Sequence, residues 1–320
     1  MKWHFVEMHC HTLHSDGQFS EEALAQAARD ELLDGIALTD HNTMACHKGM
    51  YQTGLPFIPG IEWTTFFGHM LVLGAKEYVD WRDATPDNID EKMQAVHAAG
   101  GLVGVAHPFD LGSPMCTGCY WDFNVRDWHN VDYIEVWHGE LPPLQWKARR
   151  AMKLWLDQLD AGCRITPMYG RDWHGPEFAA QPFAVTLLGT ERDEFDAQGG
   201  YDAVKNGRVM LTLGPAAYWT LTDGDKTYEM GDTIKPGKYT AHVRVDEAAR
   251  NRVWRRFDIR ADEAVFYGKD GVELARVPVV NGAAECELNV RERFVRMELH
   301  GSAMGKPCPV AISAPVYVKG

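Results

Sequence analysis

Several apolar runs in the first half of the chain end in histidines and carboxylates, which are residue types that bind metal ions. His9 and His11 are two residues apart, as are Asp172 and His174. In an extended segment, residues at this spacing point the same way, so each pair can bind one ion. A mixture of imidazole and carboxylate ligands suits Zn²⁺, Mn²⁺ or Fe²⁺. The spacing therefore predicts a metal centre.

Further candidate ligands follow other apolar runs along the chain: Asp16, His41, Glu62, His69 and His107. Ligands from different strands can converge because parallel strands all end at one face of a β/α fold. Each residue alone could be a surface group or a helix cap, but burying the whole set without a metal would be costly. The set exceeds the four ligands of one structural zinc. We therefore expect two or three divalent ions (Mn, Fe or Zn).

Other chemical motifs are weaker or missing. Cys116 and Cys119 have the spacing of a zinc or redox pair, but no second pair accompanies them, so we expect a loop pair without function. The sequence contains neither a Walker phosphate loop nor a Gly-x-Ser-x-Gly elbow, which disfavours an ATPase or a serine hydrolase.

Alternating strands and helices must position these residues up to about residue 190. Ser20 predicts the N-cap of a helix that we expect Gly35 to end. Further helices are predicted over 88–99 and 144–159, and strands over 36–38, 56–61, 70–73, 102–106, 131–136 and 165–169. Such β/α alternation predicts a parallel sheet, either open or closed into a barrel.

The pattern changes after residue 214. Val295, Met297 and Leu299 alternate with polar residues, a period of two that is typical of a strand with one buried face. We therefore predict a metal-binding domain over 1–214 and a small antiparallel β-sandwich over 215–320.

Composition narrows the possible partners. The 320 residues carry a formal net charge of −13 and no basic run, which disfavours long nucleic acids and leaves a small-molecule substrate. No apolar stretch approaches the roughly 18–20 residues of a membrane-spanning helix, so no membrane partner is expected. Seven scattered cysteines and no visible signal peptide predict a cytoplasmic protein. The oligomeric state stays open.

The ordered motifs resemble the PHP (polymerase and histidinol phosphatase) superfamily of metal-dependent hydrolases. The matching segments are His9–Thr12 with Ser15–Gly17, Thr39–Asn42, Gly60–Glu62, Ala106–Pro108 and Asp172–His174. The segments 68–74, 207–215 and 314–318 are similar to a branch that includes carbamate-pesticide hydrolases. The resemblance implies a distorted (β/α)7 PHP-type barrel followed by a small antiparallel β-sandwich-like domain.

The resemblance also implies the ligand sets. One ion would be held by His9, His11, Glu62 and Asp172, and a second by Asp16, His41 and His174. Glu62 would bridge to a third ion bound by His107 and His69.

The expected activity is a metal-dependent phosphoesterase that attacks a small phosphate ester with a metal-bridging hydroxide. The residues expected to act in catalysis are Glu62, His41, His107 and His174. A carbamate, ester or amide hydrolase using the same centre is the main alternative. A metal-stabilised binding module without catalysis is a remote one.

Overall fold

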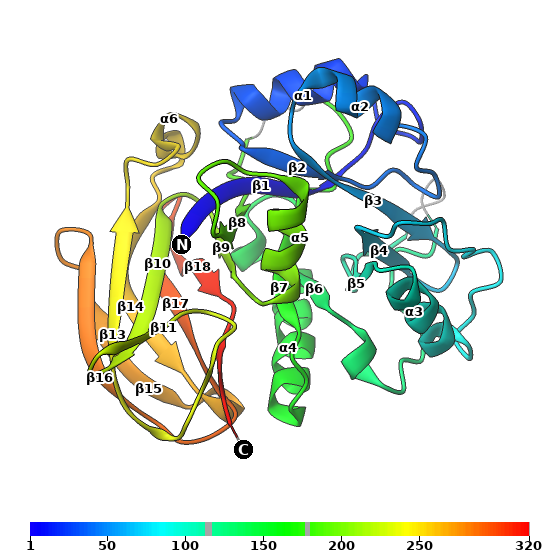
Figure 1. Ribbon diagram of the computed structural model, residues 1–320. Coiled ribbons are helices and arrows are strands. Elements are labelled where there is room, and N and C mark those ends of the chain that lie inside the picture. Colours follow the sequence, from blue (N-terminus) through cyan, green and yellow to red (C-terminus); the bar gives the residue numbers. More distant parts are fainter. Residues whose placement is uncertain (113–116, 177–179, 320) are drawn as a thin grey trace.

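The computed structural model describes residues 1–112, 117–176 and 180–319 of a mixed α/β chain (Figure 1). Its first half alternates strands and helices as the sequence predicts. These elements are β1 (Lys2–Cys10), α1 (Glu21–Asp30), β2 (Gly35–Leu38), α2 (His47–Thr53), β3 (Phe57–Thr64), β4 (His69–Leu73), α3 (Ile89–Ala98), β5 (Leu102–Val105), β6 (Tyr133–His138), α4 (Trp146–Ala161), β7 (Thr166–Gly170), β8 (Val185–Thr190) and α5 (Ala197–Lys205).

The second half consists mostly of strands. It contains β9 (Val209–Thr212), β10 (Ala216–Asp223), β11 (Lys226–Tyr228), β12 (Thr233–Ile234), β13 (Gly237–Asp246), α6 (Asn251–Trp254), β14 (Arg260–Tyr267), β15 (Glu273–Pro278), β16 (Ala283–Val290), β17 (Phe294–Ala303), β18 (Lys306–Ser313) and β19 (Val316–Val318). Short 3-10 turns occupy 128–130, 142–144, 255–257 and 269–271.

Local signals fix the start of α1 but not its end. Ser20 caps the helix, and its side chain accepts a hydrogen bond from the backbone N–H of Ala23. The prediction that Gly35 ends this helix is wrong, because α1 stops at Asp30 and Gly35 begins β2. The glycine is needed for packing instead, since a Cβ there would lie 2.3 Å from Cε1 of Phe195.

The large sheet of the first half is neither purely parallel nor closed. Strands β1, β2 and β3 are parallel, as are β5, β6 and β7, but β4 runs antiparallel to both of its neighbours. The connection between β3 and β4, residues 65–68, is too short for the crossover that a parallel pair needs. The closed barrel expected from the sequence is therefore not observed; the hydrogen-bonded path ends at β7.

The ends of β1 and β7 nevertheless approach each other. An isolated bridge joins Cys10 to Trp173, just beyond β7. Nearby, Oε1 of the buried Glu7 accepts backbone hydrogen bonds from Met8, His9 and Arg171 at 2.9, 3.2 and 2.8 Å. Glu7 thus joins the backbones of both segments where the described structure has no ladder between β1 and β7. Burial raises the pKa of this carboxyl to about 7.

The small antiparallel sandwich expected for the C-terminal strands is not confirmed. Strands β17 and β18 continue the large sheet, because β18 pairs with β9 and β9 with β8. A four-stranded sheet in the order β11-β10-β13-β16 packs beside them (Figure 1). The boundary at residue 214 stays a prediction.

Within the described residues, no helix is both long and apolar enough to cross a membrane. Cys116 lies outside the described residues, and the predicted cysteine pair is therefore not placed.

Glu7 accepts hydrogen bonds from buried backbone donors both on β1 and just after β7. We therefore expect Glu7→Ala to lower the free energy of unfolding by about 3 kcal/mol. Glu7→Gln keeps an acceptor oxygen and should lose under about 1 kcal/mol. Urea denaturation of both variants checks this. Equal losses in the two variants would contradict the bridging role of the oxygen.

Candidate metal centre

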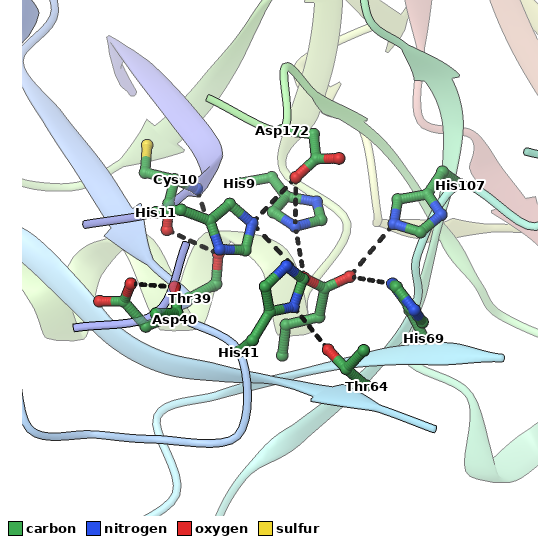
Figure 2. Close-up of polar contacts among 12 residues, drawn as sticks. His9, Cys10, His11, Thr39, Asp40, His41, Thr64, His69, His107 and Asp172 are labelled. Atoms are coloured by element: carbon green, nitrogen blue, oxygen red, sulfur yellow. Dashed lines mark hydrogen bonds and ion pairs between the residues drawn. The ribbon is translucent and has the colours of Figure 1, made fainter. Parts of the chain in front are cut away.

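The first predicted ligand set comes together at the carboxyl ends of β1 and β3 and just after β7. Nε2 of His9 lies 3.2 Å from Oε2 of Glu62 and 3.3 Å from Oδ1 of Asp172. Nε2 of His11 lies 3.4 and 2.9 Å from the same two oxygens. Figure 2 shows Asp172 above the rings of His9 and His11, turned toward them. The two Nε2 atoms, Oε2 of Glu62 and Oδ1 of Asp172 thus lie close enough together to bind one ion.

The hydrogen bonding of these four atoms tests whether a cation fits. They are buried, and none has a hydrogen-bond partner within the described residues. Unpaired buried polar atoms are costly, and neighbouring lone pairs repel each other. Four ligands at about 2.0–2.1 Å from one Zn²⁺ would lie roughly 3.3 Å apart in a tetrahedron. The observed separations match this spacing, so the residues present fit a divalent ion.

The second set lies on the solvent side of the first. Oδ1 of Asp16 is 3.0 Å from Nε2 of His174 and 3.4 Å from Nε2 of His41. His11 joins this group, which the sequence did not predict. The side chain of Asp16 is 62% exposed, whereas that of Glu62 is fully buried. The centre therefore opens to solvent beside Asp16.

The third set depends on the reversed direction of β4. His69 begins this strand and pairs with Thr64 at the end of β3, so the antiparallel direction brings it to the ligand-bearing edge. Nδ1 of His69 and Nε2 of His107 lie 2.9 and 3.1 Å from the same oxygen of Glu62, Oε1. Figure 2 shows both rings on the side of the centre away from His11. Glu62 thus contacts all three sets.

Electrostatics favour cations throughout the centre. Burial alone would raise the pKa of Glu62, but the surrounding imidazoles hold it well below the usual range. The pKa of Asp172 is likewise lowered well below its usual range, by His9 and His11 against the effect of burial. Burial opposes protonation of His41, yet Asp16 and Glu62 raise its pKa to about 10. The carboxylates therefore stay ionised and attract positive charge.

Carboxylates outside the ligand sets orient their neighbours. Oε1 of Glu135, on β6, lies 2.8 Å from Nδ1 of His9, and Oε2 accepts the backbone N–H of His107. This contact places the proton of His9 on Nδ1 and leaves Nε2 free for a metal. Asp40 accepts hydrogen bonds from Thr12 and Ser15 and so braces the loop that carries Asp16. Neither carboxylate is among the predicted ligands.

The backbone is unusual at two of the predicted ligands. His107 and Asp172 have φ angles of +24° and +59°, a region that residues other than glycine rarely adopt. The extended conformation assumed for 172–174 is therefore wrong at Asp172. His174 nevertheless reaches Asp16, because the Trp173 bridge to Cys10 holds the intervening residue.

All nine predicted ligand residues lie in this one cluster, including the four assigned to catalysis. They come from widely separated parts of the chain, and several belong to more than one ligand group.

No protein-family model and no curated protein sequence matches this chain. Solved structures do resemble it. A two-domain protein from Bacteroides vulgatus, described as containing a predicted PHP-like metal-dependent phosphoesterase, is 14% identical with a TM-score of 0.53. The match covers 98% of this chain and 95% of the other. At this identity, the likeness shows a shared fold.

Two further matches are shorter. A structure from Bifidobacterium adolescentis, assigned by prediction as a metal-dependent phosphoesterase, is 18% identical with a TM-score of 0.40, covering 62% of this chain and 95% of its own. The lesion-specific endonuclease EndoQ of Pyrococcus furiosus is 15% identical with a TM-score of 0.40, covering 64% and 56%. Scores this low add nothing to the fold assignment. The Bacteroides neighbour is the one described as PHP-like, and the carbamate-hydrolase branch is not confirmed.

Proposed function

We propose that this protein is a metal-dependent hydrolase, and that its substrate is a small phosphate ester. The observation that carries the proposal is the convergence of four buried acceptor atoms without hydrogen-bond partners in the described structure, on His9, His11, Glu62 and Asp172. One cation among these atoms would satisfy all four, and further ligand groups adjoin them through Glu62 and His11.

The neighbouring ligand groups favour phosphoryl chemistry. Two or three divalent ions held side by side would activate a water molecule and neutralise the negative oxygens of a phosphoryl group. The net charge of −13 disfavours the binding of a long polyanion, which favours a small substrate.

The residues divide the remaining tasks. Glu62 holds the groups together, and Glu135 fixes the ring of His9. His41 and His174 line the open side beside Asp16, whereas His107 is 4% exposed with Nε2 on Glu62. Among these three histidines, one that binds no ion could protonate a departing alcohol, and the open side suits His41 or His174 for this better than His107.

A carbamate or carboxylic ester hydrolase is the second candidate, and one cavity favours it. A cavity of about 450 Å³ is lined by Thr64, Phe66, Phe67 and Trp81. Thr64 contacts Nδ1 of His41, which places the cavity next to the ligand cluster. Phe66 is 80% exposed at its rim. A neutral aromatic group would fit such a lining.

Metal dependence is tested with Glu62→Gln and His107→Ala. Changes outside a ligand set typically cost 10–100-fold in metal affinity or activity, so losing a ligand should cost at least about 100-fold in turnover and reduce bound metal. Elemental analysis and a chelator-sensitive assay on the same samples measure both. Lys153→Ala, on an exposed side chain of α4 that pairs with Asp157, is the control. Near-normal activity in both ligand variants would contradict the assignment of Glu62 and His107 to the metal centre.

Substrate class is tested with a panel of phosphate monoesters against aryl carbamates and aryl acetates. We expect the metal-loaded protein to hydrolyse the phosphate esters, with kcat/KM at least about 100-fold above that for the neutral substrates, because the ions clamp anionic oxygens. The reverse preference, lost in Phe66→Ala but kept in Tyr51→Ala, would support the second candidate. Tyr51 is a similarly exposed aromatic residue on α2.

A further inference from the structure

His138 is a buried histidine next to the ligand cluster that none of the three sets includes. It ends strand β6, is 8% exposed, and packs its ring 4.9 Å from that of His107. Both of its ring nitrogens are buried and have no hydrogen-bond partner within the described residues. Unpaired buried polar atoms are costly, so a bound group is expected to satisfy at least one of these nitrogens.

Neighbouring charges set which nitrogen carries the proton. Oδ2 of Asp110 lies 3.5 Å from Nδ1 of His138, and the same oxygen accepts a hydrogen bond of 2.8 Å from Lys147. The contact to Nδ1 is longer than a hydrogen bond, but the negative charge favours the tautomer with its proton on Nδ1. The Glu135–His9 pair has the same order, a carboxylate behind Nδ1 and Nε2 facing the centre. Nε2 of His138 then carries no proton, and its lone pair is free to bind.

That lone pair faces a second acceptor. Nε2 of His138 lies 3.7 Å from Oδ2 of Asp172, while Oδ1 of Asp172 faces His9 and His11. An anionic substrate oxygen would bring a third lone pair to this point and would be repelled. A cation matches both atoms, because a separation of 3.7 Å fits two bonds of about 2.1 Å that meet at roughly 120°.

We propose that Nε2 of His138 and Oδ2 of Asp172 together hold a further divalent cation, of the type that accepts nitrogen and oxygen ligands (Zn²⁺, Mn²⁺ or Fe²⁺). Asp172 then bridges this ion and the one bound by His9 and His11. With two protein ligands, the ion keeps open positions for water or substrate. The inference rests on the proposed metal centre and extends it by one position.

The test counts metal ions without measuring catalysis. Wild-type protein and His138→Phe are stripped with a chelator, reloaded with Zn²⁺, desalted and measured by elemental analysis. We expect His138→Phe to hold about one ion fewer per chain. Asp110→Asn keeps the ring but loses the charge behind Nδ1, so it should weaken the binding of this ion about 10–100-fold in a Zn²⁺ titration.

His97→Phe is the matched control, because His97 on α3 also pairs with an aspartate, Asp132, at 2.8 Å but stands outside the cluster. It should load like the wild type. Equal metal loading and affinity in His138→Phe and His97→Phe would overturn this inference but not the proposed function. An unchanged metal count in His138→Phe together with lost binding of inorganic phosphate would also overturn it. That result would make His138 a substrate contact. If His138→Phe does not fold, the Asp110→Asn titration decides. A wild-type protein that binds no metal would overturn the proposed function as well.

Discussion

The rest of the structure depends on the burial of one ionised carboxylate, that of Glu62. Five imidazoles lie within 3.4 Å of its oxygens, and the side chain has no solvent exposure. Removing such a charge from water costs several kcal/mol unless opposite charge replaces the hydration. Protons on the histidines or divalent ions among them can supply that charge. In either case, five separate segments must reach one point, and this requirement shapes the sheet.

Three devices bring the segments together. The parallel strands end at one edge and carry His9, His11, Glu62 and His107 there or one or two residues beyond. The antiparallel β4 brings the first residue of a strand to the same edge. The Cys10–Trp173 bridge and the Glu7 carboxylate join β1 to the segment that carries Asp172 and His174. The left-handed backbone at Asp172 persists because the bridge beside it fixes the next residue.

Carboxylates behind the histidines form a second level of organisation. Glu135 holds His9, and Asp110 stands behind His138 in the same orientation. Such contacts fix ring tautomers, and thereby decide which nitrogen faces the centre. Their residues follow no spacing rule relative to the histidines, since Glu135 is 126 positions from His9 along the chain. Sequence motifs therefore do not predict which carboxylate contacts which histidine.

The sequence by itself determined the strand and helix alternation, the cap at Ser20, and the candidate ligands, because these follow from neighbours within a few residues. Spacing of two in a strand fixed the common direction of His9 and His11. Only the tertiary structure decided that β4 is reversed, that the sheet stays open, and that the C-terminal strands continue it through β9 and β18. It also decided the role of Glu135 and the position of His138. Pairing between distant strands depends on the packing of the whole chain, whereas local spacing determines only which face a side chain takes.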